Sequence, residues 1–419
     1  MFCGGCFRDN ALVAALRKLD HSTTMLPLYL PLTLDEENQS AGTPIFFSGV
    51  NVYLAQKFAL FRDTPEWLHK FLASPFLLKL AAGQAGKTHP RDLGQLTVSM
   101  IRGEEGNQAR ELEPLLDWLK SQEKPEIISL SNALLIGLAR RLKKELRVPI
   151  VCSLQGEDFF LDSLLQPHRD LAWKVLAERA VDIDLFIAPS KYFAELMSKR
   201  LGIPVNRIRV IYNGINLEGY GLTQNSKPKT QNFQTLGYFA RMCPEKGLDK
   251  LVAAFIALKK RDEFKKLKLK IGGGCGPADE PFVEEMRGRL EANKILQDVG
   301  FFPNLTRDEK VSFLKSIDVF SVPALYGEAF GLYVIEALAA GVPVVQPRHA
   351  AFPELIEATS GGLLCEANAD SLAEKIGGLL SNPEQARALG DAGRKAVFEK
   401  FSVEKMARET VDAFAGLVM

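Results

Sequence analysis

Several features that would assign a chain to a particular protein class are missing from this sequence. Its 419 residues contain no apolar run of about 18 residues, so we expect no membrane-spanning helix. The first residues, MFCGGCFRDN, reach charge at Arg8 and Asp9 without an apolar segment, which argues against a signal peptide. Lys and Arg total 52 against 51 Asp and Glu, and this balance argues against a protein whose whole surface binds nucleic acid, while leaving room for a local basic patch.

Cysteine is also scarce, and the pattern of cysteines excludes a disulfide framework. The six cysteines are mostly isolated, as expected for reduced thiols in a cytoplasmic protein. Cys3 and Cys6 have C-x-x-C spacing, but no second pair follows to complete a zinc site. The chain has no internal repeat and no low-complexity segment. We therefore expect a cytoplasmic globular protein without a structural metal.

Helix-like and strand-like segments alternate along most of the chain. Buried strands are predicted at 23–32, 148–154, 184–190, 235–241, 267–274 and 342–347, and helices at 7–19, 131–146, 248–260, 330–341 and 403–418. Such alternation predicts βαβ units and parallel sheets. The expected fold is α/β, with two doubly wound, Rossmann-like parallel-sheet domains that face each other across a cleft.

A polar break divides the chain near its middle. The stretch LTQNSKPKTQN at 222–232 has no periodicity and is typical of a linker. With a length that suits two domains of about 200 residues, it predicts an N-terminal domain at 1–214 and a C-terminal domain at 215–401. The terminal helix at 402–419 is expected to pack back on the first domain.

Two patterns match known signatures without the context that these signatures require, and two further segments have an unusual composition. AAGQAGKT at 81–88 resembles a phosphate-binding loop, but His89-Pro90 opposes the helix that should follow it. Asp182 and Asp184 form a D-x-D that leads directly into a strand, which favours structural positions over metal ligation. The apolar segment 58–83 and the basic run 139–147 allow peripheral contact with a membrane, but packing within the domain and a solvated helix face are the favoured interpretations.

The segment 323–354 carries the strongest chemical signal. Glu328 and Glu336 are separated by seven residues, and Gly331 stands where a helix is expected to begin. The backbone N–H groups of Phe330, Gly331 and Leu332 would point out of the helix N-terminus, where a diphosphate can bind. Glu328 could accept hydrogen bonds from a sugar, and Glu336 from a pair of ribose hydroxyls.

A second segment supplies cations. Arg241 and Lys246 lie in GYFARMCPEKG, after the first predicted strand of the second domain. Two cations at a strand end can neutralise a diphosphate and stabilise it as a leaving group. A pair of solvated side chains is the alternative.

Taken together, these segments resemble the retaining glycosyltransferases of family 4, which have the GT-B architecture. The resemblance extends over most of the chain, from the expected Gly-Gly turn at Gly4-Gly5 through APS at 188–190 and YNGIN at 212–216 to the two segments above. It implies a sugar transfer from a nucleotide-diphosphate sugar to an acceptor, which is a glycan, a lipid-linked molecule or a small molecule. No nucleic acid is an expected partner, and the oligomeric state is not predicted.

The resemblance also implies roles for individual residues. Arg241 and Lys246 would bind the donor diphosphate. The backbone N–H groups of Phe330, Gly331 and Leu332 would complete the diphosphate site. Glu336 would bind the ribose, and Glu328 would contact the donor sugar at the catalytic centre. Gly4 and Gly5 would let the backbone approach the donor, and Gly300 and Phe301 would lie near the base. The transfer is expected to proceed with retention and without metal or cofactor, because fixed cations and a helix dipole can stabilise the leaving diphosphate.

One position departs from the family pattern. Many members have a histidine after the strand that here reads VPIVCSL, and this chain has Gln155 there. An amide binds a hydroxyl but cannot exchange protons. Glu157 or Asp158 could replace the histidine, or both could cap the next helix, and His349 is a weaker candidate. The alternatives are therefore a non-catalytic or altered nucleotide-sugar-binding protein, or a nucleotide-sugar epimerase or sugar phosphorylase on the same fold.

The first residues differ from the family pattern as well. Family 4 chains normally begin with a buried central strand before the Gly-Gly turn, and here the Gly-Gly pair stands at positions 4 and 5. We therefore expect that the first strand of the N-terminal domain is missing and that Met1 is an internal methionine.

Overall fold

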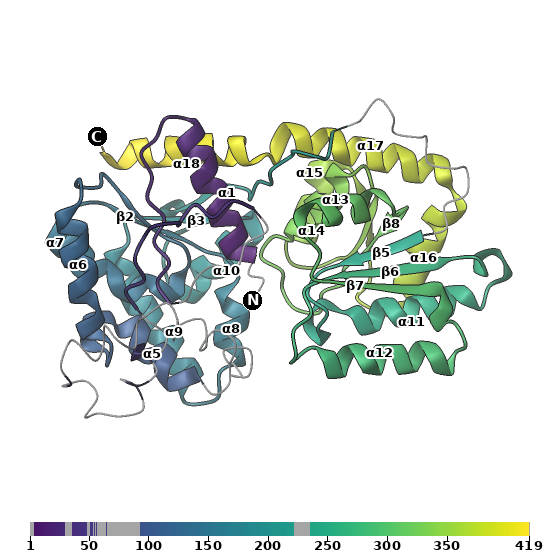
Figure 1. The fold of residues 1–419 in the computed structure, drawn as a ribbon, viewed down its shortest axis with the longest axis horizontal. Helices are drawn as coiled ribbons and strands as arrows, with labels where there is room; N and C mark the ends of the chain where they lie inside the picture. The colour runs from purple at the N-terminus through teal and green to yellow at the C-terminus, as the bar shows by residue number, and fades with distance from the viewer. Residues whose placement is uncertain are drawn as a thin grey trace. The chain divides into compact units, whose positions relative to one another are not determined.

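The computed structural model describes residues 4–29, 36–47, 51–52, 54, 56, 64, 93–221 and 235–418. Cys3, the loop at 81–88, the linker at 222–232 and nearly all of segment 58–83 lie outside these residues. The chain divides into two compact units (Figure 1). The N-terminal unit comprises Gly5–Tyr212 and Ala407–Met419, and the C-terminal unit comprises Met1–Gly4 and Asn213–Met406.

The described residues of the N-terminal unit form a parallel sheet of four strands in the order β1-β2-β3-β4. The strands are β1 (Ile128–Leu130), β2 (Ile150–Ser153), β3 (Leu185–Ala188) and β4 (Ile208–Val210). The described helices are α1 (Gly4–Lys18), α5 (Gly94–Arg102), α6 (Leu112–Ser121), α7 (Ala139–Leu146), α8 (Glu157–Ser163), α9 (His168–Arg179) and α10 (Lys191–Leu201). Every residue of β2 is buried, as expected for a central strand covered on both faces.

The C-terminal unit contains a parallel sheet of six strands in the order β10-β9-β8-β5-β6-β7. The strands are β5 (Thr235–Phe239), β6 (Lys268–Gly273), β7 (Val299–Pro303), β8 (Val319–Phe320), β9 (Val344–Pro347) and β10 (Gly362–Cys365). Counted within this unit, the order is 3-2-1-4-5-6 read from β7, which is the Rossmann order. The chain therefore reverses its direction of winding between β5 and β8, and ligands bind at such a point.

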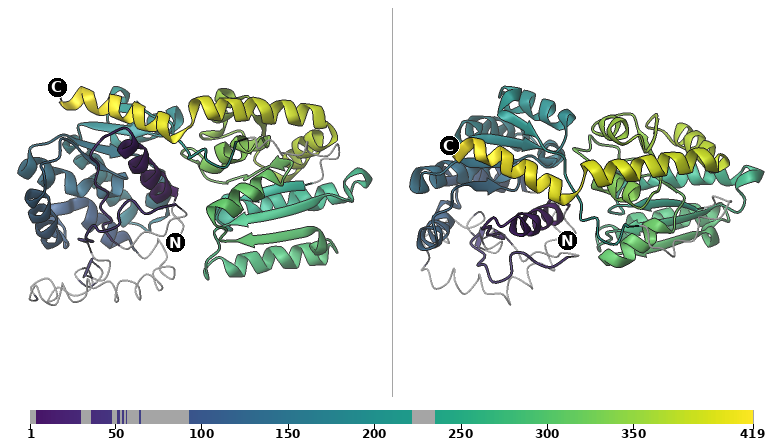
Figure 2. Two further views of the ribbon diagram at one scale, coloured as in Figure 1. Left: turned by 45° about the horizontal axis from the view of Figure 1, so that its top comes forward. Right: turned by 90° about the horizontal axis from the view of Figure 1, so that it is seen from above.

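Helices cover both faces of this sheet. They are α11 (Leu248–Lys259), α12 (Glu280–Ala292), α13 (Arg307–Lys315), α14 (Leu332–Ala339), α15 (Phe352–Thr359), α16 (Ala369–Ser381) and α17 (Pro383–Lys400). Helices α11 and α12 lie on one face, whereas α14 and α17 lie on the other, where they pack against each other (Figures 1 and 2). The last helix, α18 (Val403–Val418), begins in the C-terminal unit and continues in the N-terminal unit from Ala407.

Most predicted elements are present, two expectations about them are wrong, and one is correct only in part. The described residues 23–29 of the predicted strand at 23–32 are not a strand. The helix predicted at 131–146 is a 3₁₀ helix, η5 (Ala133–Leu138), followed by α7. Gly4 and Gly5 are the first residues of helix α1 and do not form a turn. A helix tolerates glycine best in its first turn, where backbone N–H groups lack intrahelical partners in any case.

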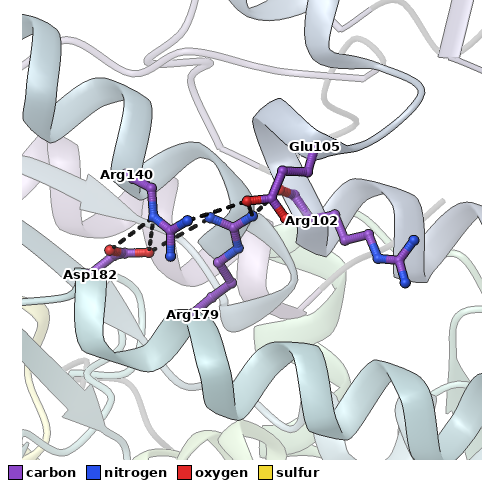
Figure 3. Close-up of polar contacts among 5 residues, drawn as sticks. All are labelled: Arg102, Glu105, Arg140, Arg179 and Asp182. Carbon is purple, nitrogen blue, oxygen red and sulfur yellow. Dashed lines mark hydrogen bonds and ion pairs between the residues drawn. The ribbon is translucent and has the colours of Figure 1, made fainter.

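A buried arginine connects three elements of the N-terminal unit. The side chain of Arg179, at the end of α9, is 4% exposed and lies 3.0 Å from Glu105 and 4.0 Å from Asp182. It also donates to the carbonyl oxygen of Arg102 at 2.7 Å, and Arg140 bridges the same two carboxylates (Figure 3). Asp182, half of the D-x-D, is therefore an ion-pair partner of arginine.

We expect Arg179→Met to destabilise the protein by about 2 kcal/mol, because the carbonyl of Arg102 loses its charged donor in a buried setting. The loss stays moderate because Glu105 is 62% exposed and Asp182 keeps Arg140. Urea unfolding measures the change. Arg169→Met is the matched control, since Arg169 is 42% exposed and pairs with its neighbour Asp170. Equal loss in both variants would contradict a special role for Arg179.

Candidate functional site

The residues predicted to bind the diphosphate and the sugar follow β5 and β8, the two strands between which the winding direction of the C-terminal sheet reverses. β5 leads into the loop with Arg241 and the 3₁₀ helix η8 (Pro244–Lys246), and β8 leads into the loop with Glu328. β5 and β8 are adjacent parallel strands, so both loops emerge at the same edge of the sheet.

Backbone contacts fasten these two loops to each other. The N–H of Leu325 donates to the carbonyl oxygen of Glu245 at 2.9 Å. Gly247, with φ of +69°, lies so close that a Cβ atom there would stand 1.9 Å from the carbonyl oxygen of Pro323. Only glycine fits this position, and the fit fixes the spacing between the two loops.

Lys246 and Glu328 form a buried ion pair. Lys246 Nζ lies 2.6 Å from Glu328 Oε2, and the two side chains are 19% and 14% exposed. The hydroxyls of Tyr333 and Tyr326 donate to the same oxygen at 2.8 and 3.2 Å. Burial alone raises the pKa of Glu328, but the charge of Lys246 and these hydrogen bonds outweigh it, so the pKa is lowered and Glu328 is ionised.

Arg241 is fixed by a carboxylate that the sequence analysis did not identify. Its Nε lies 3.0 and 3.1 Å from the two oxygens of Asp279, whose side chain is 8% exposed. Asp279 also accepts the N–H of Gly276 at 3.0 Å. Its hydrogen bonds to Arg241 raise the pKa of the guanidinium, which keeps a permanent charge on a side chain that is 59% exposed. Arg241 can therefore bind an anion at this edge.

Helix α14 begins directly after Gly331, as predicted, and follows Glu328 closely in the chain. Gly331 has φ of +98° and precedes the first helical residue, Leu332. The first-turn N–H groups of an α-helix have no intrahelical acceptor, so this end of α14 can bind an anion. Glu336, one turn further, pairs with Lys310 of α13 at 2.9 Å, and each side chain is 16% exposed. Phe330 is buried.

Gln155 and its neighbours belong to the N-terminal unit. The N–H of Gln155 donates to Glu157 Oε2 at 2.8 Å, and the N–H of Ala133 donates to Glu157 Oε1 at 2.7 Å. Burial raises the pKa of Glu157. Glu157 thus connects the segments that follow β1 and β2. These two hydrogen bonds occupy both of its carboxylate oxygens.

Asp158, the next residue, is 9% exposed, and burial raises its pKa from 3.8 to about 6. The fold favours the protonated carboxyl, so its contribution to stability is complete below about pH 4 and is lost as the pH rises through 6. We expect Asp158→Asn to stabilise the protein by about 2 kcal/mol at pH 7.5, where the native carboxylate is ionised.

Denaturant unfolding at pH 7.5 and pH 4.5 measures this difference, which should shrink at the lower pH. Asp170→Asn is a control in the same unit, because the Asp170 side chain is 74% exposed. A constant difference for Asp158→Asn at both pH values would contradict the prediction.

The remaining candidates have mainly structural contacts. His349 lies 3.1 Å from the carbonyl oxygen of Ala324, which connects it to the loop after β8. Gly300 and Phe301 lie on strand β7. The guanidinium carbon of Arg287 lies over the ring of Phe301, 3.9 Å from the ring centroid. Asp184 pairs with Lys143 at 2.6 Å and accepts the N–H of Ile150.

Two family models match the chain. The model of glycosyl transferases group 1 matches residues 222–396, and the model of glycosyltransferase family 4 matches residues 84–218. These ranges cover both units and include Arg241, Lys246, Glu328 and Glu336.

Curated relatives match over shorter stretches. An uncharacterized glycosyltransferase of Methanocaldococcus jannaschii is 27% identical over 54% of this chain and 59% of its own length. A GDP-mannose-dependent α-(1-6)-phosphatidylinositol monomannoside mannosyltransferase of Mycobacterium tuberculosis is 28% identical over 43% of this chain and 47% of its own. The chain thus spans about half the length of these relatives.

Solved structures share the fold. Sucrose-phosphate synthase from Thermosynechococcus elongatus superposes with a TM-score of 0.70 over 97% of this chain and 91% of its own, at 19% identity. HepE from Anabaena, solved in complex with UDP, gives a TM-score of 0.63 over 75% of this chain and 84% of its own, at 18% identity. By its motifs, its two parallel sheets and these matches, the chain belongs to glycosyltransferase family 4 and has the GT-B fold.

Proposed function

We propose that the protein transfers a sugar from a nucleoside diphosphate sugar to a hydroxyl of an acceptor. The observation that carries this proposal is the convergence of Lys246, Glu328 and the start of α14 at the edge where the C-terminal sheet reverses. Cations and helix N–H groups would bind the diphosphate there, and an ionised carboxylate beside them would bind sugar hydroxyls.

In this proposal the leaving diphosphate is stabilised without a metal ion or other cofactor. Negative charge grows on the diphosphate as the glycosidic bond breaks, and Arg241, Lys246 and the N-terminus of α14 are aimed at that charge. Glu336, held by Lys310, would bind the ribose hydroxyls. Gly4 and Gly5 would add backbone contacts with the donor.

We further propose retention of the anomeric configuration, with Glu328 binding sugar hydroxyls and not acting as a nucleophile. Three hydrogen bonds to Oε2 hold this carboxylate in place. Departure and attack on the same face of the sugar would then give the retained product. Gln155 would hold an acceptor or donor hydroxyl by hydrogen bonds, since an amide does not transfer protons.

The relatives suggest which substrates to test first. The mycobacterial relative is named as GDP-mannose-dependent and acts on a phosphatidylinositol mannoside, so GDP-mannose and lipid-linked or glycan acceptors come before UDP-sugars and small acceptors. No helix of the described part of the chain has the length and apolar composition needed to cross a membrane. Peripheral contact would involve the basic run on α7, where Arg140, Arg141 and Lys143 already pair with carboxylates of the same unit.

Donor consumption tests the proposal. GDP-mannose and UDP-glucose are incubated with the protein and with mannosylated lipid or sugar acceptors, in the presence and absence of EDTA. We expect release of the nucleoside diphosphate, an α-linked product by NMR and no loss of rate with EDTA. Inversion, or dependence on a divalent cation, would contradict the corresponding part of the mechanism.

A second candidate is a non-catalytic nucleotide-sugar-binding protein. It is favoured by Gln155, which cannot exchange a proton. Thermal-shift measurements separate the two, because a ligand that binds the folded state raises the melting temperature whether or not it is consumed. A shift with GDP-mannose or UDP-glucose, without consumption in the presence of any acceptor, would support this second function.

A further inference from the structure

The hydrogen bonds around Glu328 are divided unequally between its two oxygens. Oε2 accepts from Lys246 Nζ at 2.6 Å, from the Tyr333 hydroxyl at 2.8 Å and from the Tyr326 hydroxyl at 3.2 Å. Within the described parts of the chain, no group donates to Oε1. A carboxylate oxygen accepts about two strong hydrogen bonds, so Oε2 is saturated and Oε1 is the oxygen that can bind a ligand.

Tyr333 makes a different contact with each member of the ion pair. Its hydroxyl donates a hydrogen bond to Glu328. Its ring faces the ammonium of Lys246, with Nζ 5.3 Å from the ring centroid. The residue is 9% exposed and packs against Phe320 and Phe352, with ring centroids at 6.4 and 6.5 Å. Because packing fixes the ring, the direction of the hydroxyl is fixed as well, and its hydrogen bond can orient the carboxylate.

We propose that Tyr333 is a positioning residue for donor-sugar recognition: by holding Oε2 of Glu328, its hydroxyl turns Oε1 toward a hydroxyl of the donor's sugar ring. The proposal rests on the proposed function, in which Glu328 contacts that sugar. Tyr326, whose hydroxyl binds the same oxygen at the longer distance of 3.2 Å, contributes less to the same orientation.

Two substitutions separate the contacts of Tyr333. Tyr333→Phe keeps the ring beneath Lys246 and the packing but removes the hydrogen bond to Glu328. Tyr333→Leu removes both contacts. Tyr220→Phe is the matched control, because Tyr220 is a buried tyrosine of the same unit, 2% exposed, that does not contact Glu328.

Calorimetric titration with UDP, UDP-glucose, GDP and GDP-mannose measures the effect. The ratio of the Kd of the nucleoside diphosphate to that of its sugar conjugate reports the contact with the sugar. We expect Tyr333→Phe to lower this ratio about tenfold and to leave the diphosphate affinity within about twofold, because a hydrogen bond to a charged group is lost while Lys246 keeps its ring contact. Tyr333→Leu should weaken the binding of both the nucleoside diphosphate and its sugar conjugate.

A pH profile adds a measurement that a purely structural role would not change. The Tyr333 hydroxyl helps to lower the pKa of Glu328, so the acid limb of donor turnover should move to higher pH in Tyr333→Phe and stay in place in Tyr220→Phe. If Tyr333→Phe fails to fold, Tyr326→Phe should show the same two changes at smaller size. It should also weaken diphosphate binding, because the Tyr326 hydroxyl accepts a hydrogen bond from Lys246 Nζ as well.

The outcomes distinguish this inference from the function on which it rests. A wild-type ratio and acid limb in Tyr333→Phe would overturn the role of Tyr333 while the protein still bound nucleotide sugars. A wild-type protein that binds neither sugar conjugate would overturn the proposed function, and the role of Tyr333 with it.

Discussion

Replacing Lys246 with alanine should weaken the binding of nucleoside diphosphates about 100-fold and lower donor turnover by about 10³-fold. The lysine carries one of the two charges proposed for the diphosphate, and a fixed charge of this kind typically contributes 10²- to 10³-fold to such a reaction. Its removal also leaves Glu328, with a side chain 14% exposed, without its cation. Titration with UDP and GDP, followed by a donor-consumption assay, measures both effects.

The pH dependence of stability should change in the same variant. Glu328 has a lowered pKa in the folded protein, so its contribution to stability is present above the ordinary value of 4.5 and is lost as the pH falls through the folded-state value. Without Lys246, burial dominates and the pKa rises, so the variant should lose stability relative to the wild type as the pH rises above the ordinary value of 4.5.

Lys250→Ala provides the control for Lys246→Ala. Lys250 lies four residues further along, is 41% exposed and pairs with its neighbour Asp249 at 3.1 Å. We expect wild-type affinity and turnover in this variant. Unchanged diphosphate affinity in Lys246→Ala would refute the placement of the diphosphate beside this lysine.

Gly247→Ala should cause the largest loss of stability among the substitutions considered, at least about 3 kcal/mol. The left-handed conformation at φ of +69° costs an alanine about 1 kcal/mol. The added Cβ would also stand 1.9 Å from the carbonyl oxygen of Pro323, so the loops after β5 and β8 must separate. Guanidinium unfolding measures the loss, and diphosphate binding should weaken with it.

Gly202→Ala isolates the conformational part of this cost. Gly202 has φ of +64°, and a Cβ there would meet nothing within 4 Å. We expect this control to lose only about 1 kcal/mol, the cost of the left-handed backbone. Equal losses at the two glycines would contradict the close contact between Gly247 and Pro323.

Local patterns made part of the site predictable. Lys246 stands after an apolar strand, and Glu328 and Gly331 stand just before a helix, so neighbouring residues alone placed them at strand and helix ends. The fold class followed from the same alternation of strands and helices. The family match agrees with the resemblance that these motifs suggested.

The partners of these residues could not be predicted in the same way. Asp279 meets Arg241 across 38 positions, because β6 lies beside β5 in the sheet. Lys310 meets Glu336 across 26 positions, because α13 and α14 pack against each other. No local pattern encodes such a pairing. The sequence pattern predicts only that Tyr333 lies on the buried face of a helix. The hydrogen bond from its hydroxyl to Glu328 depends on tertiary packing, which the sequence pattern does not show.

Short or interrupted elements were the other source of error. β1 and β4 have three residues each, which is too few to show an alternating pattern. The stretch predicted as a strand at 23–32 contains Pro27, which has no N–H for a sheet ladder. Gly4 and Gly5 were expected to form a turn because glycine favours turns, although the helix that starts there accepts them.

The contact between the loops after β5 and β8 has a consequence for protein engineering. Because the carbonyl of Pro323 lies against Gly247 and that of Glu245 accepts the N–H of Leu325, neither loop has an independent conformation. A chimera that takes residues 240–247 from one homologue and residues 323–328 from another would combine surfaces that were never fitted together. These two loops are therefore one module, and donor specificity should be transplanted with both of them or with neither.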